Sequence, residues 1–181
     1  MNSHLIITKP APDEYPEWFA GEIELVHYND LISGLEDSFN LTLPFLQQLN
    51  TDDLVYRYAP GKWSIKQIWQ HIIDVERVLC YRALRYARKD ETVLSGFDEN
   101  KYAESSLADE RNFDDILREY ATVRNATFEL IKSFTAEMFM YRGTAGKSNM
   151  TVRSVCYLIL GHEIHHVHTI KERYLNHDFM L

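Results

Sequence analysis

The sequence predicts an all-α protein folded as a four-helix bundle. Apolar residues recur at helical spacing over four long stretches, near residues 30–49, 64–88, 112–133 and 151–175. The seven glycines and five prolines are few and fall mainly between these stretches. No stretch shows the sustained alternation of apolar and polar residues that marks a half-buried strand. The pattern therefore predicts helices packed on one another, without a sheet.

The first helix is preceded by a lead-in, residues 1–27, that holds three of the five prolines. We expect this lead-in to be extended and to pack on the bundle. In the helix at 30–49, leucine and phenylalanine recur every three or four residues. Pro44 lies inside this pattern, and proline lacks the amide hydrogen that a position inside a helix donates. The sequence therefore predicts a kink or a local break at Pro44.

The second helix begins at Ser64, whose hydroxyl can cap the helix while Gln67 reaches back to it, an arrangement known as a capping box. The apolar pattern then runs to about Arg88. Residues 89–111 show no sustained period, and a connection of this length is often functional. Because it can travel the length of a bundle, the helices on either side of it need not be antiparallel neighbours.

The third helix, at 112–133, is joined to the fourth by a loop that contains two glycines. Thr151 is placed to cap the fourth helix, whose apolar stripe passes through Val155 and Ile159. A chain of this length suits a single domain, so we expect residues 1–181 to form one folded unit.

Composition restricts the kinds of partner. The formal net charge is −8 and the basic residues are scattered, which argues against nucleic acid. No window approaches the ~20 apolar residues of a membrane span, and the N-terminal residues do not resemble a signal peptide. Cys80 and Cys156 lie singly inside helical patterns, as expected of reduced, buried thiols. We therefore expect a cytoplasmic protein with a small-molecule substrate and neither a nucleic-acid nor a membrane partner.

Four of the eight histidines lie in GHEIHHVHTI, residues 161–170. His162 and His166 are one helical turn apart, with Cβ atoms about 5–6 Å from each other, so both imidazoles can reach one metal ion. They also continue the apolar stripe and should face the core. His165 and His168 project to the flanks of that stripe and are predicted to be bystanders.

A histidine facing the core is often only a hydrogen-bonded core residue. Two neutral imidazoles buried side by side, however, need partners for four ring nitrogens, and a metal ion supplies two of these partners at once. This argument favours a metal site. The remaining histidines outside the cluster and the second helix are expected at the surface: His4, His27 and His177.

Two ligands rarely suffice, so a third is needed. The letters HEIHH match the H-E-x-x-H motif of zinc proteases, with Glu163 as general base. That motif requires a further ligand downstream, and only fifteen residues follow His166. The better third ligand is His71, which lies on the core stripe of the second helix. Asp74, one turn further on, is placed to hold the second nitrogen of His71 or a bound water.

The segments GKWSIKQIWQHIIDVER and GHEIHH resemble the DinB-like superfamily, in particular its YfiT-like branch, and the resemblance covers most of the chain. It implies a four-helix bundle of up-down-down-up topology with a divalent metal held by three histidines. Carried over residue by residue, these are His71, His162 and His166. A site of three histidines suits zinc or nickel, with iron or manganese as further options.

The resemblance also implies an enzyme, either a hydrolase or an S-transferase that uses a low-molecular-weight thiol. Three neutral ligands leave the ion its full charge, which acidifies a bound water or thiol. Asp74 and Glu163 are the candidate bases, and Arg77 and Arg82 the candidates for binding an anionic cofactor tail. The alternative function is a non-catalytic bundle that binds metal to sense or to scaffold.

Plain structural roles remain open for these candidates. Asp74 can pair with Arg77 or Lys101, Glu163 can lie on a solvated flank, and the arginines can pair with acidic neighbours on an exposed face. A homodimer is a further expectation, in which the aromatic residues of the lead-in pack either at the subunit interface or on their own bundle.

Overall fold

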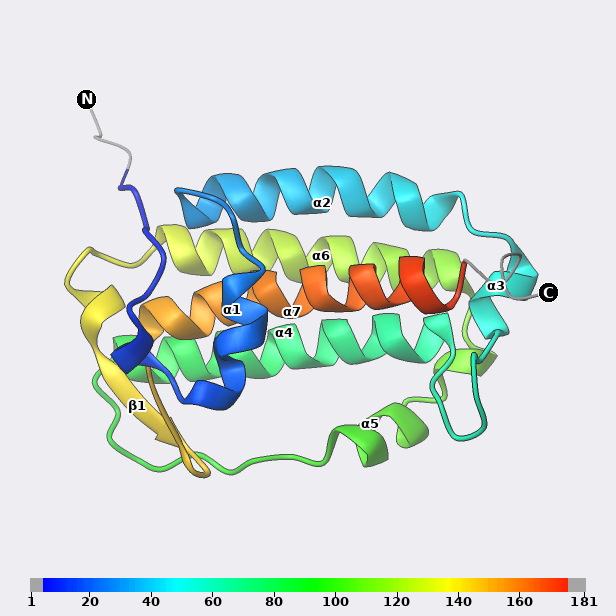
Figure 1. Cartoon of the computed structure of the whole chain (residues 1–181). Coiled ribbons are helices and arrows are strands. Elements are labelled where there is room, and N and C mark those ends of the chain that lie inside the picture. The colour runs from blue at the N-terminus through cyan, green and yellow to red at the C-terminus, as the bar shows by residue number, and fades with distance from the viewer. Residues whose placement is uncertain (1–4, 176–181) are drawn as a thin grey trace.

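The computed structural model describes residues 5–175. Four long helices lie side by side and confirm the predicted four-helix bundle: α2 (Leu31–Gln47), α4 (Ile65–Ala87), α6 (Phe113–Lys132) and α7 (Val152–Arg173). Their ends differ from the predicted ones by no more than two residues. Figure 1 shows α2 and α7 running in one direction along the bundle, and α4 and α6 in the other. A short helix, α3 (Thr51–Val55), joins α2 to α4.

Side-chain caps fix where the helices begin. The Ser64 hydroxyl accepts a hydrogen bond from the Gln67 amide, and the Gln67 side chain accepts one from the Ser64 amide, both at 3.1 Å. This is the predicted capping box. The Thr151 hydroxyl caps α7 by accepting from the Ser154 amide at 3.1 Å. Each cap satisfies amides that have no partner inside the first helical turn.

The break predicted at Pro44 is absent, because α2 is continuous from Leu31 to Gln47. Pro44 lies in the last turn of this helix. The carbonyl that loses its partner there belongs to Asn40, which is exposed, so water can take the place of the missing amide hydrogen.

The long connection between α4 and α6 runs along the length of the bundle (Figure 1). It contains α5 (Glu99–Ser105) and one turn of 3₁₀ helix at Ala108–Glu110. Near its start, the Leu94 amide donates to the Thr144 carbonyl at 2.9 Å. Near its other end, the Lys66 ammonium donates to the Asp109 carbonyl at 3.2 Å, so the connection is fastened at both ends.

The prediction of no sheet was wrong in one place. β1 (Arg142–Ala145) and β2 (Ser148–Thr151) form a two-stranded antiparallel hairpin between α6 and α7. Its tight turn contains Gly146, whose φ of 58° is a left-handed conformation that glycine adopts without steric cost. The strands are only four residues long and partly polar, so they show no alternation long enough to recognise.

The described part of the lead-in, residues 5–27, is only partly extended. It contains 3₁₀ turns at Pro12–Glu14 and Glu17–Phe19, followed by the short helix α1 (Ala20–Glu24). Pro12 is the first residue of the first turn, where its fixed φ suits a helix start, and Pro16 is the extended residue directly before the second turn. The lead-in does pack on the bundle, where the Tyr157 hydroxyl donates to the Ile7 carbonyl at 2.8 Å.

α1 lies directly against α7. A Cβ atom added at Gly161 would come within 2.1 Å of the Glu22 carbonyl oxygen, so only glycine permits this approach. Gly161 directly precedes His162. Gly161, the glycine that opens GHEIHH, therefore brings the lead-in beside the histidines.

The core consists of two apolar clusters, one toward each end of the bundle. On α4, residues from Ile65 to Ile73 belong to one cluster and residues from Val75 to Ala87 to the other. Buried polar residues occur where the two meet, among them His71 and Glu76. Within residues 5–175, no helix is long and apolar enough to cross a membrane.

Candidate metal centre

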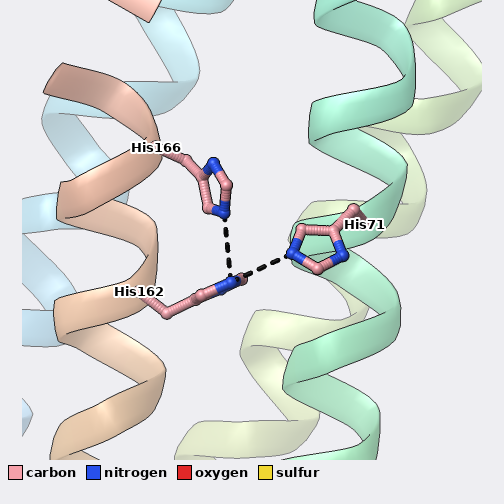
Figure 2. A group of neighbouring side chains, drawn as sticks. All are labelled: His71, His162 and His166. Atoms are coloured by element: carbon pink, nitrogen blue, oxygen red, sulfur yellow. Dashed lines mark hydrogen bonds between the residues drawn. The ribbon is translucent and has the colours of Figure 1, made fainter. Parts of the chain in front are cut away.

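α4 and α7 bring His71, His162 and His166 together (Figure 2). The Nε2 atom of His162 lies 3.1 Å from Nε2 of His71 and 3.1 Å from Nε2 of His166. The three possible ligand atoms lie within 4.8 Å of one another. His71 is buried and the other two are half-buried. We call these three residues the histidine triad.

The triad is in the protonation state that binds metal. Burial lowers the pKa of His71 to about 4. Burial, together with the neighbouring histidines, lowers the pKa of His166 to about 3 and that of His162 well below its ordinary value. All three rings are therefore neutral near pH 7, and each can offer a nitrogen lone pair.

The spacing of the triad fits a metal ion better than it fits hydrogen bonds alone. Nε2 of a neutral imidazole either donates one hydrogen or accepts one. Nε2 of His162, however, faces two other ring nitrogens at 3.1 Å, and it cannot serve both. Ligands at ~2.0–2.1 Å from one ion lie roughly 2.9–3.4 Å apart at tetrahedral to octahedral angles. The two distances from Nε2 of His162 fall within that range.

A cavity of about 320 Å³ opens beside the triad. All three histidines line it, together with the exposed His165. Its apolar walls come from the 3₁₀ turn at Glu17–Phe19, from α4 and α7, and from the loops before α4 and α5: Phe19, Trp63, Val75, Leu79, Phe97 and Leu158. Trp63 packs against His71 with ring centroids 4.8 Å apart. The charged residues of the lining are Glu22, Arg82 and Glu99.

Of the two arginines proposed to bind an anion, Arg82 lines the cavity and Arg77 does not. Arg77 pairs with Glu119 at 2.5 Å and lies 3.6 Å from Asp74. Asp74 also accepts a hydrogen bond from Gln70 at 3.1 Å. Burial is the main cause that raises the pKa of Asp74 above its ordinary value. The pairing of Asp74 with Arg77 foreseen from the sequence is thus present, and Asp74 is not part of the cavity lining.

Glu163 follows His162 in the chain but is fully buried, so it does not lie on a solvated flank. It accepts hydrogen bonds from Ser38 at 2.5 Å, from Tyr120 at 2.7 Å and from Arg124 at 2.6 Å. These donors come from α2 and α6. Glu163 therefore ties α7 to two other helices of the bundle.

Arg124 extends these contacts to a second carboxylate. Its Nε and Nη2 atoms donate to Glu76 at 3.0 and 2.9 Å, and the Thr127 hydroxyl donates to Glu76 at 2.6 Å. The Arg124 and Glu163 side chains are 0% exposed, and that of Glu76 is 2% exposed. We call Glu76, Arg124 and Glu163, with the hydroxyl groups that donate to them, the buried network.

Glu76 and Arg124 were not predicted as site residues. A signal was present, because each lies on the apolar stripe of its helix, where a charged side chain needs a buried partner. The five histidines predicted to lie outside the metal site agree with the prediction where they can be compared: His27, His165 and His168 are exposed, whereas His4 lies outside the described residues. His177 lies outside them as well.

Three neutral imidazoles beside a cavity form a site suited to a divalent metal, and the protein is a helical bundle with such a site. The sequence profile of the DinB superfamily matches residues 35–170. The chain belongs to the DinB superfamily.

Two known proteins are similar to this chain. A protein of Oceanobacillus iheyensis, whose name places it provisionally among metal-dependent hydrolases, is 31% identical over 87 residues. The match covers 48% of this chain and 50% of that relative, so the chain spans about half of the relative's length. YfiT from Bacillus subtilis is described as a probable metal-dependent hydrolase with an unusual four-helix bundle topology. Its structure superimposes with a TM-score of 0.69 over 79% of this chain and 85% of YfiT, at 17% identity, and this likeness concerns the fold.

Proposed function

We propose that the protein is a metal-dependent hydrolase whose divalent ion is held by His71, His162 and His166. The observation that carries this proposal is the convergence of three neutral imidazoles beside a cavity of about 320 Å³, with Nε2 of His162 at 3.1 Å from Nε2 of both other histidines. The names of both similar proteins support it. Zinc or nickel is the proposed ion, ahead of iron or manganese.

The residues of the site divide the work. A divalent ion with three neutral ligands keeps its full charge and, when bound, acidifies a water or thiol. His71, His162 and His166 hold this ion, and Trp63 limits the rotation of the His71 ring by packing against it. The apolar walls of the cavity orient a substrate and exclude bulk water.

We assign different roles to the two carboxylates. Each oxygen of Glu163 already accepts at least one hydrogen bond inside the protein. Glu163 is therefore a structural residue that holds α7 against α2 and α6. Asp74 lies outside the cavity lining and pairs with Arg77, so we assign it the role of an ion-pair partner on α4 and not that of a base.

Transfer of a thiol is the second candidate reaction. The observation that favours it is Arg82, which lines the cavity and can bind the anionic tail of a thiol cofactor. A non-catalytic metal-binding module is the third candidate. The cavity beside the triad favours an enzyme over this module, because a sensing or scaffolding site needs no room for a substrate.

Three expectations from the sequence accompany this proposal. We propose that the chain forms a single domain and acts as a homodimer. We also propose a cytoplasmic location, since Cys80 and Cys156 are free thiols. Burial raises the pKa of Cys80 to about 11 and raises that of Cys156 well above its ordinary value, so neither is a nucleophile near neutral pH.

Metal analysis of the freshly purified protein tests the function. We expect one divalent ion per chain in the wild type, and almost none in His162→Ala or His166→Ala. His71→Ala should weaken binding by orders of magnitude, whereas the controls His165→Ala and His168→Ala should keep the metal. A panel of small esters and of thiols with an electrophile, each with and without chelator, then separates the reactions. Full metal in all three triad variants would rule out the site.

A further inference from the structure

The rim of the cavity carries charges of both signs from three different elements. Arg82 comes from α4, Glu22 from α1 and Glu99 from α5. Glu99 is exposed, and the other two are half-buried. Arg82 has its guanidinium carbon 5.9 Å from the centre of the Phe97 ring. Within residues 5–175, Arg82 makes neither a hydrogen bond nor an ion pair.

These charges are only partly compensated by one another. Burial lowers the pKa of Arg82, and the negative charge of Glu99 acts in the opposite direction. The two side chains do not form an ion pair. Burial and the nearby charge of Glu22 raise the pKa of Glu99. The rim therefore holds one guanidinium with free donors and two carboxylates that repel each other.

A ligand with a single charge fits this rim poorly. A carboxylate would bind Arg82 but would be repelled by Glu22 and Glu99, and an amine would meet the opposite problem. A ligand with both charges satisfies all three groups at once. We propose that the cavity binds a small molecule that carries an ammonium and a carboxylate group at one end, as an amino acid does. This inference rests on the proposed function and names the class of its substrate.

The rest of the cavity determines how such a ligand lies. His71, Val75, Leu79 and Arg82 follow one another at helical spacing and form a stripe on α4. The stripe is about 16 Å long at 1.5 Å per residue. Side chains on a helix tend to lean toward its N-terminus, which for Arg82 is the direction of Leu79, and both residues line the cavity. The charged end of the ligand therefore lies at Arg82, its apolar body on Val75 and Leu79, and its reacting bond at the triad.

A matched set of three probes tests this inference on the purified, metal-loaded protein. L-norleucine carries both charges, hexanoate lacks the ammonium group, and pentan-1-amine lacks the carboxylate, while all three share a similar apolar chain. Calorimetric titration should show norleucine binding at least about tenfold more tightly than either analogue, as expected for one added charge-assisted contact. Hexanoate binding as tightly as norleucine, or no norleucine binding at millimolar concentration, overturns the inference.

Variants assign the effect to the rim. Arg82→Gln should weaken norleucine about tenfold and leave pentan-1-amine no weaker, whereas the double variant Glu22→Gln/Glu99→Gln should weaken norleucine about threefold and leave hexanoate no weaker. The matched control Arg77→Gln removes the same charge from the same helix outside the cavity and should change none of the three affinities. Equal losses in Arg82→Gln and Arg77→Gln contradict the assignment. Metal content is measured in the same preparations, so a wild type without metal refutes the proposed function, while a missing charge preference at full metal refutes this inference alone.

Discussion

The histidine triad and the buried network lie in the middle of the same bundle and draw on the same two helices, yet they are built in opposite ways. α4 contributes His71 to one and Glu76 to the other, and α7 contributes the consecutive residues His162 and Glu163. In the network, all four carboxylate oxygens accept hydrogen bonds. In the triad, Nε2 of His71 and Nε2 of His166 both face Nε2 of His162, which can form a hydrogen bond with only one of them.

This difference separates a site that stabilises from a site that binds. The buried network carries full charges but has no donor or acceptor left to offer to a ligand, apart from Nη1 of Arg124, which has no partner within residues 5–175. The triad carries no charge but converges three lone pairs on one point beside a cavity. Readiness to bind a ligand therefore follows from unmet hydrogen-bonding capacity and access, and not from charge.

The largest effect on stability should come from Arg124→Met. The change leaves two carboxylates buried without their cation, and breaking a buried ion pair costs about 3–5 kcal/mol. Denaturant unfolding measures this loss. The control Arg118→Met removes an exposed partner of Asp115 and should cost about 0–1 kcal/mol. Replacing Glu76, Arg124 and Glu163 with methionine together should cost less than Arg124→Met alone, and a larger cost would refute this account of the network.

Two variants, one in each region, test whether the buried network and the histidine triad act independently. Glu163→Ala leaves three donors unpaired and should cost about 2–3 kcal/mol of stability while keeping the metal. His162→Ala should lose the metal and cost less than about 1 kcal/mol in the metal-free protein, because it also relieves the crowding of ring nitrogens. Metal analysis and unfolding of the metal-free proteins check both. Loss of metal in Glu163→Ala at temperatures where the chain is folded would show that the two regions are not separable.

A smaller effect is expected at Gly161, where the lead-in meets α7. Alanine gains about 1 kcal/mol of helix propensity over glycine. Its Cβ, however, would lie 2.1 Å from the Glu22 carbonyl oxygen, and such overpacking costs about 1–3 kcal/mol. We expect Gly161→Ala to loosen α1, seen as faster amide exchange at residues 17–26. Gly21→Ala is the control, since its Cβ meets nothing within 4 Å, and unchanged exchange in both variants would contradict the close contact.

The smallest effect concerns a carboxylate at the edge of the bundle. Glu14 is buried and accepts hydrogen bonds from Thr151 at 2.8 Å and from Arg153 at 3.1 Å. Burial raises the pKa of Glu14, but the hydrogen bonds from Arg153, the Ala11 amide and Thr151 outweigh it and leave the pKa below 4.5. A carboxylate whose pKa is lowered by folding stabilises the protein above the pKa of the unfolded chain.

Glu14→Gln should therefore cost about 1 kcal/mol at neutral pH. The difference from the wild type should persist above pH 4.5 and disappear as the pH falls through the lowered pKa of Glu14. Melting temperatures of both proteins between about pH 3.5 and 7 test this. A difference that grows on acidification has the wrong sign and would show that the ion pair with Arg153 does not anchor the lead-in.

Local patterns predicted the long helices well. The caps at Ser64 and Thr151 act over three residues, and an apolar stripe repeats on every turn, so both can be read directly from neighbouring letters. The register of α7 likewise predicted which two histidines face inward. The choice of His71 depended on its place on the core stripe of α4, and the structure brings it to the other two.

Contacts between distant residues could not be predicted in this way. Arg124 and Glu76 are 48 residues apart, and each alone looks like an ordinary charged residue on a helix. The hairpin at 142–151 depends on the pairing of β1 with β2 and of Ala145 with Leu94, and not on a pattern within either strand. The partners of Glu163 come from α2 and α6, so its burial could not be inferred from α7.

The lead-in packs closely on α7 at Gly161, so the cavity is lined by two parts of the chain that can change separately. α4 and α7 supply the imidazoles, whereas Phe19 and Glu22 come from the lead-in, outside the four long helices. New residues in the lead-in would alter what the cavity admits without moving any ring nitrogen, as long as position 161 stays glycine. A bundle of this kind can thus acquire new specificity when one short peripheral segment changes, while the helices that carry the histidines stay the same.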